Sequence, residues 1–325
     1  MSDESAAPPV HPLLVRQLRR AGIAEAELAS DPRLAELVRR VSRTYVEHDE
    51  DRYLRERSLE LSSREMQELN ARLAAERKRL QGELDIARSL QTSILPRDVV
   101  ADTYEVAGRM VPATEVGGDY YDVIPVNGGC WVAIGDVAGH GLRAAVIMTM
   151  IQSMTAALIR QNPTITPREV VIALNRAVRE NVFQRLSVDN FVTLTVLHCR
   201  PDGQVRFAGA HEVILVHRAA ARTCEEIETP GTWLGPMDDI APFTVEGAFQ
   251  LERGDLMVLY TDGVTEARNA NHEPFGLTNL SSCIRETHAE PIATICERVI
   301  DDVRRWMRAE EDDVSLLVYR HLGAA

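Results

Sequence analysis

Apolar residues are spaced differently in the two parts of the chain, and the first part has a helical repeat. Residues 51–94 contain no proline and one glycine. Every seventh position there is apolar or small, at Leu59, Met66, Leu73, Leu80, Ala87 and Ile94. The companion seam position is half polar and holds Ser62, Leu69, Glu76, Glu83 and Leu90. The pattern predicts one long helix, which either pairs with a second copy as a coiled coil or lies on a globular domain. Pro96 disfavours helix at the residue before it, so this helix is expected to end near Leu95.

The segment before this helix is expected to form shorter helices. Residues 1–10 have the composition of a disordered end. Leu13, Leu14 and Leu18 fall at helical spacing, and the pair Asp31-Pro32 predicts the start of a second helix. Partner docking, extension of a dimer and a helical cap all remain open as roles for residues 11–48.

Beyond Pro96, short apolar runs alternate with turn signals such as Asn127-Gly128-Gly129. Strands are expected at 104–110, 122–125, 130–134, 191–198, 204–208, 213–217, 256–260 and 314–319. Helices are expected at 142–160, 166–183, 279–287 and 291–307. Because β-α-β alternation and a glycine-rich phosphate loop are both missing, we predict an α+β fold with helices outside a sheet sandwich. The predicted domains are a helical region (1–50), a long helix or coiled-coil linker (51–96) and a C-terminal globular domain (97–325).

Charge and cysteine usage narrow the functional classes. The net charge is −13, and residues 1–96 sum to −1, which leaves −12 for residues 97–325. Nucleic-acid binding needs basic patches, so we expect no nucleic-acid partner. The five cysteines form no Cys-x-x-Cys pair, which argues against disulfides and zinc and favours a reducing, cytoplasmic location. No apolar stretch of the length needed to span a bilayer is evident, and no signal peptide, so no membrane association is expected.

Acidic residues stand at the ends of several predicted strands, flanked by glycine or small residues. The motifs are Gly117-Gly118-Asp119, Gly135-Asp136-Val137-Ala138-Gly139-His140-Gly141, Thr261-Asp262-Gly263 and Asp312-Asp313. Each one alone is an ordinary turn sequence. Together they predict converging carboxylates, which a cation would have to neutralise. Oxygen ligands favour Mg²⁺ or Mn²⁺ over zinc, and two such ions can aim a water at phosphorus.

These motifs carry a resemblance. Residues 87–320 resemble the metal-dependent protein phosphatase family, in its bacterial SpoIIE/RsbU-like branch. The resemblance rests on Ala87–Pro96, on the acidic motifs above followed by Tyr120-Tyr121-Asp122, and on Phe191-Val192-Thr193-Leu194, Gly209-Ala210-His211, Tyr260–Ala267 and Asp312-Asp313-Val314-Ser315. Their shared order over most of the chain makes the match specific.

The resemblance implies a sandwich of two antiparallel sheets flanked by helix pairs, with two Mn²⁺ or Mg²⁺ ions at one end. Asp136 would bridge both ions. Asp119 and the carbonyl group of Val137 would hold one ion, and Asp262 and Asp312 would hold the other. A hydroxide shared by the metals would be the nucleophile, so Asp119 and Asp136 are the expected catalytic residues.

Three residues near these motifs keep open roles. Asp313 adjoins Asp312, and either could be the direct metal ligand, with Asp312 preferred. His211 follows Gly209-Ala210 where many relatives have Ala-Gly, and it either acts near the site or is a buried structural histidine. His140 suits a turn as well as a phosphate contact.

The resemblance implies a phosphoserine or phosphothreonine substrate on a protein, possibly an anti-sigma-factor antagonist. No arginine in the acidic motifs is an obvious phosphate clamp, so substrate choice is expected to depend on a broad docking surface. A catalytically silent phosphoprotein-binding scaffold and a small-molecule metal phosphoesterase are the alternatives. We further expect a homodimer through residues 51–95, whose helix packing would alter metal affinity at Asp119 and Asp136.

Overall fold

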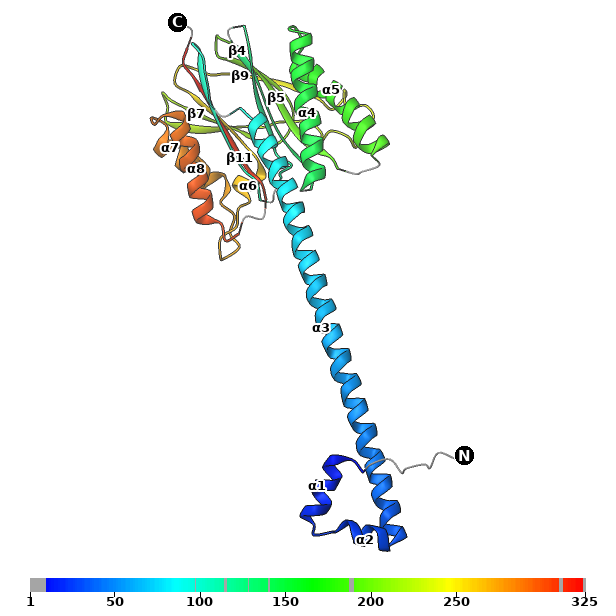
Figure 1. Ribbon diagram of the computed structural model, residues 1–325. Helices are drawn as coiled ribbons and strands as arrows, with labels where there is room; N and C mark the ends of the chain where they lie inside the picture. Colours follow the sequence, from blue (N-terminus) through cyan, green and yellow to red (C-terminus); the bar gives the residue numbers. More distant parts are fainter. Residues whose placement is uncertain are drawn as a thin grey trace. The chain divides into compact units, whose positions relative to one another are not determined.

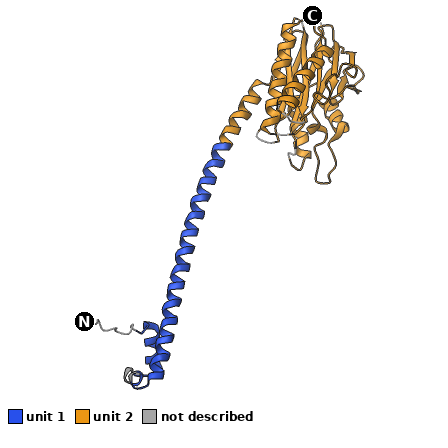
Figure 2. Cartoon of the chain, turned by 90° about the vertical axis from the view of Figure 1, so that its right-hand side faces the viewer, with its two compact units in different colours: residues 1–80 blue, residues 81–325 orange. Residues whose placement is uncertain are grey.

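The computed structural model describes residues 10–96, 98–113, 116–127, 129–139, 141–186, 190–309 and 312–323, with only the backbone for residues 25, 26 and 29. The predicted disorder of residues 1–9 and the central Gly128 of the predicted hairpin turn lie outside the described residues. The chain divides into two compact units, residues 1–80 and residues 81–325, which Figure 2 shows in blue and orange. The division falls within the long helix.

The N-terminal unit contains α1 (Pro12–Arg20), α2 (Glu25–Ser30) and the first part of α3 (Pro32–Ile94). His11 fastens α1 to α3, because its backbone N–H donates to Ser42 Oγ at 2.8 Å and its ring stacks on Tyr45. The predicted start at Pro32 and the predicted end beside Pro96 are confirmed. The helices expected at residues 32 and 51 are one helix, since no glycine or proline lies between them.

The seven-residue seam of α3 is exposed to solvent in the single chain. The side chains of Leu59, Met66, Leu73 and Leu80 leave between 46% and 70% of their surface accessible. A helix usually buries its apolar stripe, and an extended exposed stripe marks an interaction surface. This exposure favours the coiled-coil alternative, which remains a prediction.

The C-terminal unit contains two antiparallel sheets. Sheet A runs in the order β1 (Asp98–Val100), β2 (Tyr104–Val111), β11 (Val314–His321), β10 (Leu256–Tyr260), β7 (Ile214–Arg218) and β8 (Thr223–Ile227). Sheet B runs in the order β3 (Tyr120–Val126), β4 (Gly129–Val137), β5 (Val192–Cys199), β6 (Gln204–Ala210) and β9 (Glu246–Gln250). All the strand pairs are antiparallel.

Alternation along the central strands creates two apolar layers. On β10, Met257 and Leu259 belong to the core that sheet A shares with sheet B. Leu256 and Val258 point the other way and pack with the helices over sheet A. This period of two is why strands buried on both faces appear in the sequence as continuous apolar runs.

Two helix pairs cover the outer faces of the sheets (Figure 1). Sheet B carries α4 (Leu142–Gln161) and α5 (Pro167–Val178), and the π-helix η1 (Arg179–Arg185) continues α5. Sheet A carries α7 (Gly276–Thr287) and α8 (Ile292–Trp306), and a short helix α6 (Asp262–Thr265) follows β10. The predicted α+β sandwich flanked by helix pairs is confirmed.

Helix α4 corrects one prediction. By length and composition it is apolar enough to cross a membrane, although no such stretch was expected. Its buried residues, among them Ile147, Met148 and Ile151, pack in the core against sheet B. An apolar helix that covers a sheet within a domain passes the same length and composition test as a membrane span.

Three strands were missing from the sequence-based prediction: β1, β8 and β9. Each forms the edge of a sheet. The residues of β8, Thr223-Cys224-Glu225-Glu226-Ile227, are mostly polar and exposed. Short polar edge strands avoid aggregation and therefore lack the apolar run that identifies a buried strand.

Candidate metal centre

Strand pairing in sheet B brings two acidic motifs together. The start of β3 lies beside the end of β4, and Tyr120 pairs with Gly135. Asp119 immediately precedes β3, and Asp136 is the next-to-last residue of β4. The register therefore places these two carboxyl groups at the same end of the sheet.

Sheet A makes the corresponding arrangement. The end of β10 lies beside the start of β11, and Tyr260 pairs with Leu316. Asp262 begins α6 just after β10, while Asp312 lies two residues before β11. Both sheets thus deliver acidic residues from the ends of paired strands.

Hydrogen bonds join the two sheet ends. Thr261 Oγ1 donates to Asp119 Oδ2 at 2.8 Å and accepts the N–H of Ser315 at 3.0 Å. Asp313 Oδ2 accepts the N–H of Gly118 at 2.7 Å. Because sheet A supplies Thr261 and Asp313 while Asp119 and Gly118 lead into sheet B, these contacts fix the acidic ends against each other.

The carboxyl groups lie close enough to raise one another's pKa. Burial, followed by the charges of Asp262 and Asp312, raises the pKa of Asp136 to about 7. Burial, Asp136 and Asp313 raise the pKa of Asp119, which is 1% exposed, well above its usual value. The pKa values of Asp262 and Asp312 are also raised, mainly by burial. Asp119 and Asp136 thus both face acidic groups across the two sheet ends, and a cation would relieve the repulsion.

Gly118 leaves room for an oxygen-lined cradle. A Cβ at this position would lie 2.8 Å from the Val137 carbonyl oxygen, 3.1 Å from Asp136 Oδ1 and 3.2 Å from the Gly139 carbonyl oxygen. Oxygen atoms alone fit a hard cation such as Mg²⁺ or Mn²⁺. Within the described ranges, no three His, Cys, Asp or Glu side chains already form a ready-made metal site. These carboxylate and carbonyl oxygens fit Mg²⁺ or Mn²⁺ as ligands. To coordinate such an ion directly, the carboxylates, which repel one another, would have to move closer to it.

The structure separates Asp312 from Asp313. Both carboxylate oxygens of Asp313 are occupied, since Oδ1 accepts the N–H of Ala113 at 2.8 Å and Oδ2 accepts the N–H of Gly118. Asp313 is buried, whereas Asp312 is exposed and lines a cavity. Among the described residues, the one donor to Asp312 Oδ1 is the backbone N–H of Asp313, at 2.8 Å. This favours Asp312 as the available ligand and gives Asp313 a structural role.

His211 is a partly buried histidine whose two ring nitrogens both have partners. Nε2 donates to the Tyr260 carbonyl oxygen at 3.1 Å, and Nδ1 accepts the Thr193 hydroxyl at 2.9 Å. Thr193 Oγ1 also accepts the N–H of Asp136 at 3.3 Å. Burial lowers the pKa of His211 to about 4, so the ring is neutral near pH 7 and supports the strands. His140, the other histidine of interest, lies outside the described residues.

Sequence reasoning assigned no role to Gln91 or to Thr261. The amide of Gln91 donates to the Gly117 carbonyl oxygen at 2.7 Å and accepts the Gly117 N–H at 3.1 Å. Gln91 is 4% exposed and lies in the last turn of α3. The only available signal was its place within Ala87–Pro96, the first segment of the family resemblance.

Comparison with known proteins identifies the family. The family described as Stage II sporulation protein E (SpoIIE) matches residues 127–322, more than half of the chain. The chain belongs to the SpoIIE family. The family match spans β4 to β11 and includes the motifs of Asp136, Asp262 and Asp312.

Relatives of this SpoIIE-family chain include phosphatases. It is 29% identical over 248 residues to "Phosphoserine phosphatase RsbU" of Bacillus subtilis, which covers 74% of this chain and 70% of that protein. The SiaA-PP2C domain of Pseudomonas aeruginosa has a TM-score of 0.65 at 20% identity and covers 76% of this chain and 99% of that domain. RsbX in complex with magnesium has a TM-score of 0.52 at 11% identity, and the match covers 69% of this chain and 98% of RsbX. The fold is therefore that of the PP2C-type phosphatases.

Proposed function

We propose that the protein is a Mn²⁺- or Mg²⁺-dependent serine/threonine phosphatase that removes phosphate from phosphoserine or phosphothreonine on a protein substrate. The convergence of Asp119, Asp136, Asp262 and Asp312 at one end of a PP2C-type sandwich carries this proposal. Two divalent cations held there would supply the chemistry of hydrolysis, by lowering the pKa of a water and neutralising charge on the phosphoryl group.

The residues divide into two sets around Asp136. Asp119 and the Val137 carbonyl would hold one ion, Asp262 and Asp312 the other, and Asp136 would contact both. The interaction of Asp136 with the acidic groups of both sheets supports this assignment. Asp119 and Asp136 act by binding the ions, so the chain itself need not provide a nucleophile.

The remaining polar groups hold these ligands in place. Thr261 orients Asp119 by donating to Oδ2. The Asp313 carboxylate accepts the backbone N–H of Gly118 and so fixes the loop that precedes Asp119. His211 is unsuited to donate a proton at neutral pH, because its ring is neutral and its Nε2 proton is committed to a carbonyl oxygen.

We propose a phosphorylated protein as the substrate, of the anti-sigma-factor-antagonist type that the resemblance implies. The relative RsbU is named a phosphoserine phosphatase, which supports this choice. The acidic net charge gives no basis for a nucleic-acid partner.

We also propose regulation through α3. In this scheme residues 1–50 are a regulatory helical region, residues 51–96 a dimerising linker and residues 97–325 the catalytic domain. The exposed seam at Leu59–Leu80 supports pairing with a second copy. Gln91 supplies the link to the centre, because the last turn of α3 contacts the loop that carries Asp119.

Hydrolysis of p-nitrophenyl phosphate by the full chain tests the proposal. Turnover should require Mn²⁺ or Mg²⁺, and the Asp136→Asn variant should lack it. Candidate phosphorylated antagonist proteins, incubated with the wild type and Mn²⁺, should lose phosphate. Activity that survives both chelation and the substitution would rule the proposal out, and hydrolysis of nucleotides in preference to phosphoproteins would favour a small-molecule phosphoesterase.

A further inference from the structure

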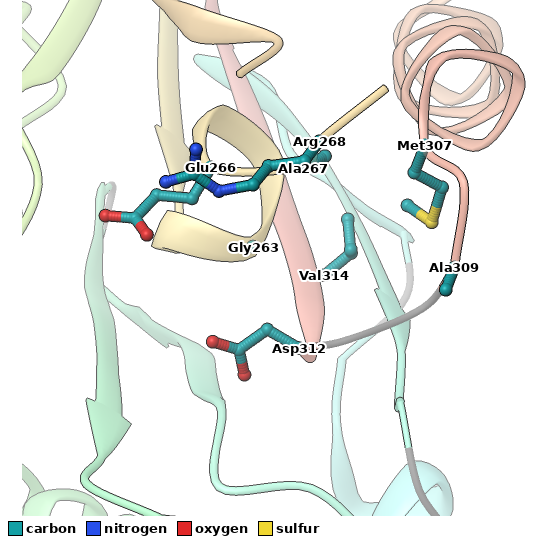
Figure 3. A pocket seen from close by; sticks show the side chains of 8 residues that line it. All are labelled: Gly263, Glu266, Ala267, Arg268, Met307, Ala309, Asp312 and Val314. Atoms are coloured by element: carbon teal, nitrogen blue, oxygen red, sulfur yellow. The ribbon is translucent and has the colours of Figure 1, made fainter. Parts of the chain in front are cut away.

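A cavity of about 130 Å³ lies next to the proposed metal centre. Asp312, Glu266, Arg268 and Met307 contribute to its lining. Figure 3 shows that the charged ends of Glu266, Arg268 and Asp312 extend toward the same side. A group that entered this cavity would meet a proposed metal ligand and a guanidinium group together.

Arg268 stands on a rigid support. Its strand bridge to Pro274 closes a short hairpin, and Asn269 Oδ1 accepts the N–H groups of Asn271 and Glu273 within the turn. The backbone N–H of Arg308 donates to the Arg268 carbonyl oxygen at 2.9 Å, which fastens the hairpin to the end of α8. Binding residues held by rigid elements lose little conformational freedom on binding.

The guanidinium of Arg268 retains free donors. One nitrogen donates to the His272 carbonyl oxygen at 3.1 Å. A guanidinium carries five N–H donors, and the described residues provide no carboxylate in an ion pair with Arg268. The contact with His272 therefore orients the side chain and leaves N–H groups available for a ligand.

Charge explains why a cation matters at this position. Of the described residues that line the cavity, Arg268 is the one with a cationic side chain, and it lies beside Glu266 and Asp312. The domain carries a net charge of −12 (the chain's −13 less the −1 of residues 1–96), so an incoming phosphate experiences repulsion before it reaches the centre. A planar guanidinium matches phosphate oxygens in geometry as well as in charge.

We propose that Arg268 binds the phosphoryl group of the substrate at the cavity beside Asp312 and so determines substrate affinity. The inference rests on the proposed phosphatase function. It revises the sequence-based expectation of a site without a phosphate-binding arginine, since Arg268 follows the Tyr260–Ala267 motif by one residue. The guanidinium is a binding group and transfers no proton.

Inorganic phosphate is a suitable probe, because it is the reaction product and has no flanking residues. We compare wild type, Arg268→Gln, Arg268→Lys and the control Arg308→Gln, all as full-length chains with Mn²⁺. Arg308 is exposed and adjacent to Arg268, but it does not line the cavity. The first readout is inhibition of p-nitrophenyl phosphate hydrolysis by phosphate. The second is the dissociation constant of phosphate from isothermal titration calorimetry, which does not depend on turnover.

Arg268→Gln should raise the inhibition constant and the dissociation constant of phosphate about tenfold each, equivalent to about 1.4 kcal/mol. Arg268→Lys should lose less, because it keeps the charge, and Arg308→Gln should behave as wild type. Unchanged phosphate binding in Arg268→Gln, or an equal loss in Arg308→Gln, would overturn the proposal. A wild type without metal-dependent turnover would instead refute the phosphatase function itself.

Discussion

Replacing Gln91 with leucine should weaken metal binding without unfolding the domain. The substitution keeps a side chain of similar length in a buried position but removes both hydrogen bonds to Gly117. It leaves the N–H and carbonyl groups of Gly117 without these partners. Asp119 lies two residues further along the same loop, so its position depends on the anchorage that is lost.

The size of the effect follows from the two bonds. A buried group that loses its partner costs about 1–3 kcal/mol, so the loss of two partners in Gln91→Leu should destabilise the docked loop by about 2–6 kcal/mol. If half of that cost, about 1–3 kcal/mol, must be recovered when a cation orders Asp119, apparent Mn²⁺ affinity falls by about 5- to 160-fold. The maximal rate at saturating Mn²⁺ should change less than the affinity does.

The assay is a Mn²⁺ titration of p-nitrophenyl phosphate hydrolysis, with isothermal titration calorimetry of Mn²⁺ as a second measurement. Gln81→Leu is the matched control, because Gln81 is an exposed residue of the same helix whose side chain, within the described part of the chain, has Asp85 as its one hydrogen-bond partner. It should leave Mn²⁺ affinity unaltered. A Gln91→Leu protein that folds normally and binds Mn²⁺ as tightly as the wild type would refute the proposed link between α3 and the centre.

Three further predictions concern the acidic residues of the metal centre and the exposed seam of α3. The pKa of Asp136 is raised from 3.8 to about 7 in the fold, so the metal-free native state binds the proton more tightly than the unfolded chain and loses stability as the pH rises through this interval. The increase in melting temperature of Asp136→Asn over wild type should therefore be larger at about pH 8 than at about pH 5. Equal increases at both pH values would contradict the raised pKa. Asp312→Asn should reduce Mn²⁺ affinity with little change in melting temperature. Asp313→Asn should lower the melting temperature, because two backbone N–H groups lose a charged acceptor. If Asp313→Asn instead reduced Mn²⁺ affinity and Asp312→Asn lowered the melting temperature, the roles of the two residues would be exchanged. Leu73→Glu in the exposed seam should shift a dimer toward monomer in light scattering, and a wild type that is already monomeric would disprove the coiled coil.

Strongly patterned segments of the fold could be predicted from the sequence. Strand β10 was expected at its observed bounds, because five consecutive apolar residues between polar turns allow little else. The end of α3 was set by Pro96. The polar edge strand β8 could not be found this way, since its stability comes from hydrogen bonds to β7 that local sequence does not reveal.

The candidate site shows the same division. Asp119, Asp136 and Asp262 stand in short motifs at strand ends, and these motifs suggested the convergence. Gln91 and Arg268 have no local pattern of their own. The contact of Gln91 spans 26 residues of sequence, and Arg268 gains its place through a backbone bond from Arg308. Such roles depend on tertiary packing and therefore required the structure.

Mn²⁺ binding by the wild type and by Asp136→Asn, measured by calorimetry alongside phosphatase turnover, tests the central claim most directly. The two-ion centre predicts that wild type binds two Mn²⁺ ions per chain and hydrolyses phosphate esters, and that the variant loses turnover together with the tighter binding. Full metal binding and turnover in Asp136→Asn, or a wild type that binds no Mn²⁺, would contradict it.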